Sequence, residues 1–135
     1  MRNLLVTGGC GFIGSNFVNM FSQIPDTKLF VIDSLTYASD FNNIKNLVET
    51  GLIQFKNIDI RNYDKLDLFF QSNRIDEVIN FAAESHVDRS IENPKLFLET
   101  NIFGTYNLLN LALKNNVSKF LQVSTDEVYG SLGEK

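Results

Sequence analysis

Residues 7–14 read Thr7-Gly8-Gly9-Cys10-Gly11-Phe12-Ile13-Gly14, directly after an apolar run at 3–6 and at the start of a helix-favouring stretch. Glycines with this spacing permit a tight turn, let backbone amides approach a pyrophosphate and allow close helix packing. The amino terminus of the helix adds the positive end of its dipole. The stretch therefore predicts a strand, turn and helix that bind a dinucleotide. The predicted contacts are Gly8, Gly11, Phe12, Ile13 and Gly14.

A carboxylate further along the chain fits the same pattern. Asp33 follows the second expected strand, 28–32, and lies 19 positions beyond Gly14. An aspartate at this place accepts a hydrogen bond from a ribose hydroxyl and repels the additional phosphate of NADP. We therefore expect NAD as the cofactor, with Asp33 on its ribose. The alternative is a glycine turn and a loop aspartate that bind nothing.

The rest of the chain alternates short apolar runs with amphipathic stretches. We expect strands at 3–6, 28–32, 53–56, 77–80 and 119–123, and helices at 11–21, 41–49, 63–72 and 94–115. This alternation is typical of a parallel sheet covered by helices on both faces. The predicted fold class is α/β, a Rossmann-type doubly wound sheet of five strands in the order 3-2-1-4-5.

Local signals place the ends of two helices. Asn93 and Pro94 are a typical cap and first residue for the helix at 94–115. Gly51 is a typical stop for the helix at 41–49. Within 94–115, one stripe recurs at helical spacing, and we expect this stripe to face the sheet. Its members are Leu98, Ile102, Leu109 and Leu113.

Composition limits the possible functions. The 135 residues suffice for one domain, and 44% hydrophobic with 21% charged residues is a globular composition. The net charge of −4 offers no basic patch for nucleic acid or an anionic membrane.

No apolar run is long enough to span a bilayer and no secretory signal is visible, so a cytoplasmic location is expected. Cys10 is the only cysteine, which we interpret as a packing residue, and no metal site is predicted.

The carboxyl ends of parallel strands share one edge, where ligands bind in such sheets. Asp59 and Ile60 follow the third strand and could line an adenine pocket, although on spacing alone an aspartate such as Asp59 is more often a plain loop acid. Phe81, Ala82 and Ala83 follow the fourth strand, and the small alanines would let a cofactor ring lie close to the backbone.

Residues 84–90 carry more polar chemistry. His86 is the only histidine, and it is either a general base or a residue that structures its loop. Asp88 and Arg89 are expected to form a local ion pair or to be solvated. After the fifth strand, Asp126 and Glu127 are adjacent carboxylates that could act as acid and base with different pKa values. The alternative for this pair is a solvated acidic turn.

Four segments together carry a resemblance to a known family. Residues 8–14, 33–38, 82–91 and 124–130 resemble the dTDP-glucose 4,6-dehydratases, which belong to the extended short-chain dehydrogenases/reductases. The Ala-Ala-Glu-Ser-His segment and the Thr-Asp-Glu triplet are its specific parts. The resemblance implies that NAD takes a hydride from C4 of the glucose of dTDP-glucose, that water is lost across C5 and C6, and that the hydride returns to C6.

The resemblance also implies roles for individual residues. Glu127 would be the base at C5, Asp126 the acid for the leaving hydroxyl, and Thr125 a hydrogen-bond partner of the C4 oxygen. Ser85 would contact both cofactor and sugar. Asn101 matches the asparagine that bends this helix in the family. The remaining cofactor contacts that the resemblance implies are Ser34, Leu35, Thr36 and Thr100.

One motif of the family does not occur. The tyrosine and lysine spaced Tyr-x-x-x-Lys are missing, and the fourth residue after Tyr129 is Gly133. A smaller departure is Ser39-Asp40-Phe41, near the adenosine contacts. We therefore expect residues 1–135 to be an incomplete NAD-binding domain, without the nucleotide-sugar part and inactive alone, from an enzyme that is a homodimer. Alternatives are an epimerase or decarboxylase of nucleotide sugars, against which Asp126 argues, or a binding module without catalysis.

Overall fold

The computed structural model describes residues 1–130 and 133, apart from the side chains of Val87, Asp126 and Glu127. Five parallel strands form one sheet in the order β3-β2-β1-β4-β5, which confirms the predicted fold class. The strands are β1 (Arg2–Thr7), β2 (Thr27–Asp33), β3 (Ile53–Asn57), β4 (Glu77–Asn80) and β5 (Lys119–Gln122). The main helices are α1 (Phe12–Phe21), α2 (Lys45–Glu49), α3 (Tyr63–Ser72), α4 (Val87–Glu92), α5 (Pro94–Phe97) and α6 (Thr105–Lys114).

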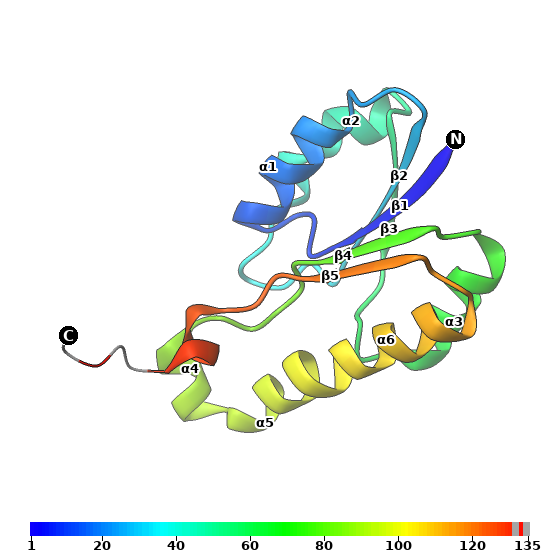
Figure 1. Ribbon diagram of the computed structural model, residues 1–135. Helices are drawn as coiled ribbons and strands as arrows, with labels where there is room; N and C mark the ends of the chain where they lie inside the picture. Colours follow the sequence, from blue (N-terminus) through cyan, green and yellow to red (C-terminus); the bar gives the residue numbers. More distant parts are fainter. Residues whose placement is uncertain (131–132, 134–135) are drawn as a thin grey trace.

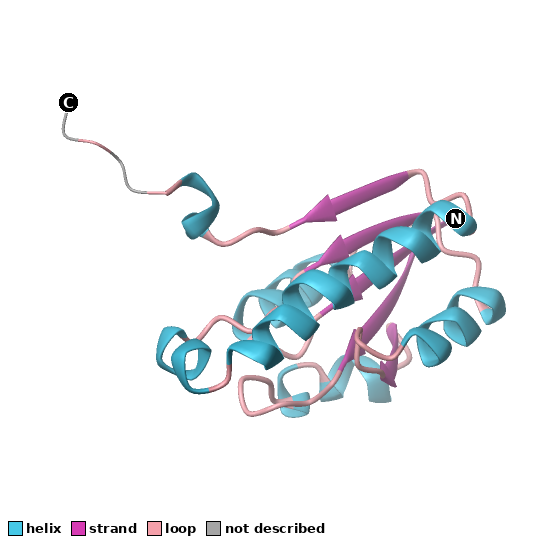
Figure 2. Cartoon of the chain, turned by 90° about the horizontal axis from the view of Figure 1, so that it is seen from below, coloured by secondary structure: helices cyan, strands magenta, loops and turns pink. Residues whose placement is uncertain are grey.

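Helices cover both faces of the sheet. In Figure 1, α1 and α2 lie on one face and α3, α5 and α6 on the other, while all strand arrows point the same way. Seen from below in Figure 2, the long segment that contains α6 crosses the sheet beneath the central strands. The carboxyl ends of all the strands therefore meet at one edge, and the loops that follow them lie side by side.

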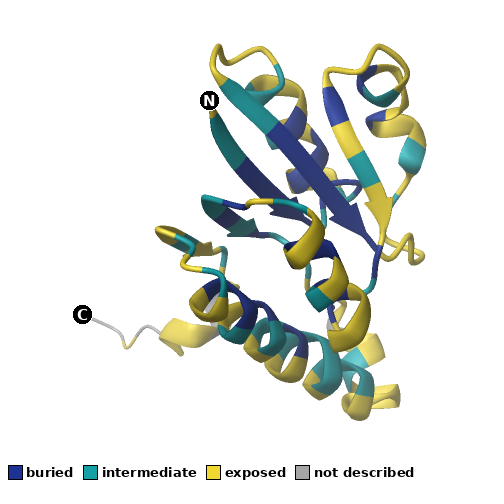
Figure 3. Cartoon of the chain, turned by 90° about the vertical axis from the view of Figure 1, so that its right-hand side faces the viewer, coloured by how far each residue is buried: buried dark blue, intermediate teal, exposed yellow. Residues whose placement is uncertain are grey.

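The core has two parts because neighbouring side chains of a strand point to opposite faces. Leu5 and Phe30 belong to the cluster beneath α3 and α6, whereas Leu4 and Val31 belong to the cluster beneath α1 and α2. Figure 3 shows buried residues concentrated in the central strands β1 and β2. Continuous apolar stretches such as 29–32 are thus explained by burial on both faces of the sheet.

The sequence predicts one α-helix at 94–115. The structure differs, because this region is not one regular α-helix. α5 is followed by a π-helical segment, η2 (Leu98–Gly104), and then by α6. Its start was predicted correctly, because the Asn93 side chain accepts a hydrogen bond from the amide of Leu96 and Pro94 occupies the first turn. The π-helical turns surround Asn101, whose side chain is bonded outside the helix.

The prediction that Leu98, Ile102, Leu109 and Leu113 face the sheet is wrong. These four side chains are exposed, and Leu113 is 81% exposed. The face that meets the sheet instead carries Gly104, Leu108, Leu111 and Ala112. Both faces of this helix are apolar, so periodicity identifies two stripes and does not show which of them faces the sheet. The stripe with Gly104 faces the sheet, because a glycine at this position lets the helix approach Ile60 closely.

The remaining boundaries agree within a few residues. The stretch at 41–49 divides into a short 3-10 turn, η1 (Phe41–Asn43), and α2, and Gly51 follows with a φ of +73° as a helix stop. Two elements were not predicted, namely α4 and the 3-10 turn η3 (Asp126–Tyr129). Among the described residues, none of the helices has the length and apolar character needed to cross a membrane.

Candidate functional site

The glycine turn after β1 requires glycine for steric reasons. Gly8 has a φ of +67°, and a Cβ atom there would lie 2.6 Å from the amide nitrogen of Ala82. A Cβ atom on Gly14 would overlap the carbonyl oxygen of Gly8. The two glycines therefore let the turn approach the loop after β4 and let α1 start directly against the turn.

The amino terminus of α1 opens beside this turn. Gly11 is the N-cap residue, and no side chain of the described residues caps this end. The amides of Phe12 and Ile13 belong to the first turn, where α-helical amides have no partner within the helix. The Phe12 and Ile13 side chains are exposed. This end of α1 can therefore offer backbone amides and a positive dipole end to an anion.

Asp33 ends β2 and is buried. Its Oδ2 accepts a hydrogen bond from the amide of Cys10 at 2.9 Å, and its Oδ1 accepts one from the amide of Leu35 at 2.8 Å. Leu35 has a φ of 55°, which residues with a Cβ rarely adopt. Asp33 thus stabilises the glycine turn and the loop after β2. A carboxylate oxygen has more than one acceptor position, so a ribose hydroxyl can still bind.

A cleft lies along the carboxyl ends of the first four strands and encloses about 600 Å³, including space open to solvent. Many of the predicted cofactor residues line it: Gly8, Gly11, Asp33, Ser34, Thr36, Asp59, Ile60, Phe81, Ala82, Ala83 and Thr100. The other predicted residues lie outside its lining: Phe12, Ile13, Gly14, Leu35 and Ser85. Ser85 is exposed in the loop before α4.

The cleft is also lined by residues that were not predicted as cofactor contacts: Ile32, Ala38, Ser39, Ile58, Arg61 and Glu84. Arg61 forms two-pronged hydrogen bonds with Asp59, of which the Nη2 to Oδ2 bond is 2.6 Å, and lies 3.7 Å from Glu99. Burial alone would raise the pKa of Asp59, but the hydrogen bonds and charge of Arg61 hold that pKa below its usual value. Asp59 is therefore a partly exposed carboxylate that is paired with Arg61 and lines the cleft.

A second cavity adjoins the cleft at the end of β5. Thr125 lines it, and so do Ala82 and Ala83, which also line the cleft. The other lining residues are Asn101, Thr105, Gln122, Val123, Ser124 and Val128. The side chains of Asp126 and Glu127 lie outside the described residues, although their backbone begins η3. The fold thus brings Thr125 next to the loop after β4.

A buried polar network fixes the position of that loop. The Thr7 hydroxyl donates to Oδ1 of Asn80, whose Nδ2 donates to Oε1 of Gln122 at 2.8 Å. The amide of Ala82 donates to Oδ1 of Asn80 at 3.2 Å. The network links β1, β4 and β5 at their carboxyl ends, so it holds both cavities in a fixed relation.

The loop after β4 is also held from the helical side. Asn101 donates from Nδ2 to the Glu84 carbonyl at 2.9 Å and accepts from the Glu84 amide at 2.8 Å. The guanidinium of Arg89, an exposed residue, lies 3.7 Å from the centre of the Tyr37 ring. His86 packs edge-on against the same ring with centroids 5.2 Å apart. Contacts of this kind leave no signal in the sequence.

Cys10 agrees with its interpretation as a packing residue. It is buried in the cluster beneath α1 and α2. Burial, with the nearby charges of Asp33 and Asp40, raises the pKa of the Cys10 thiol to about 12. The thiol therefore remains protonated at neutral pH and is a poor nucleophile.

Comparison with protein families and curated proteins gives a consistent result. Residues 5–135 match the family model described as GDP-mannose 4,6 dehydratase. The chain is 44% identical over 130 residues to the low-salt glycan biosynthesis protein Agl12 of Haloferax volcanii, covering 96% of this chain and 41% of that protein. It is 40% identical over 142 residues to a dTDP-glucose 4,6-dehydratase of Neisseria meningitidis, covering 98% of this chain and 40% of that protein. The chain thus spans about 40% of the length of these relatives.

Solved structures show the same likeness. The dTDP-glucose 4,6-dehydratase of Bacillus anthracis in complex with NAD has a TM-score of 0.86 and 40% identity, covering 100% of this chain and 41% of that one. The UDP-Glc/GlcNAc 4-epimerase of Campylobacter jejuni has a TM-score of 0.89 and 29% identity, covering 96% of this chain and 39% of that one. The fold is therefore common to dehydratases and epimerases.

Proposed function

Because the chain belongs to the GDP-mannose 4,6 dehydratase family, we propose that it forms the NAD-binding part of a nucleotide-sugar 4,6-dehydratase. One observation carries this proposal. The glycine turn, the uncapped start of α1 and the Asp33 carboxylate lie together at the carboxyl edge of the sheet, on or beside one cleft. A pyrophosphate and a ribose need these groups in this arrangement.

The residues of the cleft suit NAD. The amides near Gly11 would hold the pyrophosphate and Asp33 the adenine ribose, with Asp59 and Ile60 beside the base. Ala82 and Ala83 would leave room for the nicotinamide half, and Thr100 lines the cleft nearby. When bound, NAD supplies the capacity to accept and return a hydride. The NAD named with the Bacillus anthracis dehydratase supports this assignment.

The substrate would lie against the second cavity. Thr125 would hydrogen-bond the sugar C4 oxygen, and Ser85 would contact cofactor and sugar. Glu127 would take the C5 proton and Asp126 would protonate the C6 hydroxyl as it leaves, so that water is lost. Two alanines, Ala82 and Ala83, line both the cleft and the cavity that Thr125 lines, and this adjacency supports the proposed arrangement.

dTDP-glucose is the proposed substrate. Several relatives near 40% identity are named dTDP-glucose 4,6-dehydratases, and the Thr125-Asp126-Glu127 triplet favours a dehydratase over an epimerase of the same fold. Since the 135 residues contain no Tyr-x-x-x-Lys pair, we expect the chain alone to bind NAD without turnover. Incubation with NAD and dTDP-glucose, followed by mass spectrometry for loss of water, tests this expectation. A dehydrated product would contradict it.

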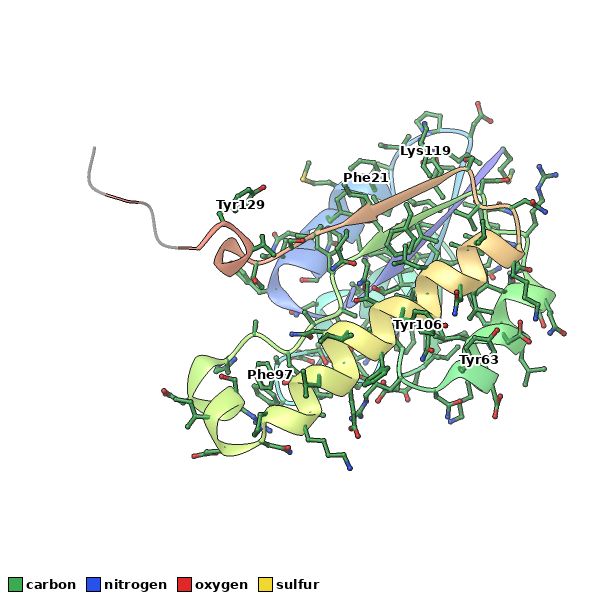
Figure 4. All side chains as sticks on the ribbon, turned by 60° about the horizontal axis from the view of Figure 1, so that its bottom comes forward. Phe21, Tyr63, Phe97, Tyr106, Lys119 and Tyr129 are labelled. Atoms are coloured by element: carbon green, nitrogen blue, oxygen red, sulfur yellow. The ribbon has the colours of Figure 1, made fainter. Side chains whose placement is uncertain are left out.

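A homodimer is also part of the proposal. The exposed apolar stripe of the helical region 94–115 gives it a surface, formed by Leu98, Ile102, Leu109 and Leu113. Phe103 and Tyr106 extend this stripe. Figure 4 shows Phe97 and Tyr106 along this region, with Tyr63 on the neighbouring α3. A surface of this kind is expected to be covered by a partner.

Calorimetric titration of the purified chain with NAD and with NADP tests the cofactor proposal. We expect saturable binding of NAD and weaker binding of NADP, because the Asp33 carboxylate repels a ribose phosphate. Circular dichroism on the same sample checks that the chain is folded. A folded chain that binds neither cofactor, or prefers NADP, would overturn the proposal.

A further inference from the structure

Tyr37 connects two loops that lie on opposite sides of the cleft. The loop at 34–40 follows β2 and contributes Ser34 and Thr36 to the cleft, whereas the loop after β4 contributes Ala83 and Glu84. Tyr37 and Arg89 themselves lie outside the cleft lining. Any influence of this pair on a ligand must therefore act through the positions of the two loops.

Contacts to Tyr37 come from three places in the second loop and α4. The Arg89 guanidinium lies over the ring face at 3.7 Å from its centre, where the π electrons attract a cation. The Tyr37 hydroxyl donates to Oε2 of Glu84 at 3.3 Å. His86 packs against the ring edge-on, with an interplanar angle of 80°. We call Tyr37, Glu84 and Arg89 the clasp.

The loop at 34–40 needs such a contact because its own conformation is costly. Leu35 has a φ of 55°, a region that a side chain with a Cβ disfavours. The ends of the loop are anchored, by Asp33 to the Leu35 amide and by the Asp40 amide to the Cys10 carbonyl. Tyr37 lies between these anchors, and the clasp joins the middle of the loop to the rest of the fold.

The other side of the clasp is rigid. Glu84 is buried, and Asn101 bonds both its amide and its carbonyl. The Tyr37 hydroxyl is therefore connected, through Glu84 and Asn101, to the π-helical segment η2. The connection runs from the loop after β2 across the cleft to the helical layer.

We propose that the clasp positions the two sides of the cleft before NAD binds, so that Tyr37 and Arg89 are positioning residues for the cofactor. This inference rests on the proposed function. A loop that is already ordered costs the ligand less conformational entropy on binding. Without the clasp, NAD must order the loop at 34–40 itself and binds more weakly.

A double-mutant cycle tests this coupling by titration with NAD. Arg89→Met and Tyr37→Leu should each weaken NAD binding roughly three- to fivefold, and the double variant should be no weaker than either single variant. Arg89→Lys keeps the charge over the ring, so it should bind nearly as well as the unaltered chain. Tyr37→Phe keeps the ring but loses the hydrogen bond to Glu84, so its loss should be smaller than that of Tyr37→Leu. Arg74→Met, at the opposite edge of the sheet, is the matched control and should have no effect. Additive losses, or none, would overturn the proposal.

Hydrogen exchange without NAD separates this proposal from the proposed function. The amides of Leu35, Ser39 and Asp40 are hydrogen-bonded in the loop, and Arg89→Met should accelerate their exchange. Unchanged exchange would overturn the clasp even if the chain bound no NAD. Faster exchange with unaltered NAD affinity would overturn its positioning role. Failure of the unaltered chain to bind NAD would contradict the proposed function, and the exchange rates would still decide whether the clasp orders the loop.

Discussion

The negative charge of Asp33 serves two roles, one in the fold of the loop and one in the proposed binding of the ribose. Its two oxygens accept the amides of Cys10 and Leu35, and it lines the cleft where a ribose would lie. An asparagine keeps one acceptor oxygen and turns an N–H group toward the other amide. Both the fold of the loop and the choice of cofactor therefore depend on the carboxylate.

Asp33→Asn should weaken NAD binding roughly 10- to 100-fold, because a hydrogen bond to a charged group contributes about 1.5 to 3 kcal/mol. NADP should lose less, because the repulsion of its phosphate also disappears. Titration of the variant with both cofactors measures this change in preference. Asp67→Asn, on the surface of α3, is the control. An unaltered preference for NAD would show that Asp33 does not bind the ribose.

Gly8 and Gly51 offer a matched pair with φ values of +67° and +73°. In Gly51→Ala the new Cβ meets no atom within 4 Å, so the free energy of unfolding should fall by only about 1 to 2 kcal/mol, the cost of the left-handed backbone. In Gly8→Ala the new Cβ also collides with the Ala82 backbone, so this substitution should destabilise the fold further and abolish NAD binding. Urea unfolding and NAD titration measure both effects. Equal losses from the two variants would contradict this account of the turn.

Single residues differ in how far the sequence predicts them. Gly8 and Asp33 have fixed places relative to strands, so their positions on the cleft followed from spacing. Arg61 and Glu84 line the cleft as well, and Tyr37 stacks against Arg89. The contact between Tyr37 and Arg89 joins parts of the chain far apart in sequence, and no local pattern encodes it.

Among the helices, the region at 94–115 shows the limit of periodicity. Its cap at Asn93 was predicted correctly because capping is local chemistry. Its orientation was predicted wrongly because Leu108 and Leu109 belong to two apolar faces, one buried and one exposed. The π-helical turns near Asn101 depend on bonds to Glu84 across the molecule. Tertiary contacts therefore determine which face of this helix is buried and where its turns are π-helical.

The exposed face of this region leads to a prediction about assembly. Leu109→Glu puts a charge on the proposed dimer surface and should shift the chain toward monomer with little change in its free energy of unfolding. Its neighbour Leu108 is buried, so Leu108→Ala should instead cost about 2 to 5 kcal/mol of stability. Sedimentation equilibrium and urea unfolding separate the two effects. Met20→Glu, on an exposed position of α1, is the control for assembly.

A monomeric unaltered chain would contradict the dimer surface, and so would a dimer that Leu109→Glu leaves intact. In either case the stripe from Leu98 to Leu113 would be an exposed apolar face without a second copy of the chain as its partner. The cofactor proposal does not depend on this result, because the cleft lies at the strand ends.

The topology of the whole molecule brings residues that are far apart in sequence to one edge of the sheet. Parallel strands joined by right-handed crossovers put every carboxyl end on one edge. Gly8, Asp33, Asp59, Ala82 and Thr125 therefore come together although they span most of the chain. This much was predictable from the alternation of strands and helices. The shape of the cleft was not, because side chains such as Arg61 and Glu84 complete it.

The most direct test of the account is an NMR titration of backbone amides with NAD. We predict that the largest shift changes occur at Gly11, Phe12, Leu35 and Ala82, around the cleft. The amide of Ser118, at the opposite edge of the sheet, should not move. Shift changes confined to other surfaces, or none at saturating NAD in a folded chain, would contradict the claim that this edge of the sheet is a dinucleotide site.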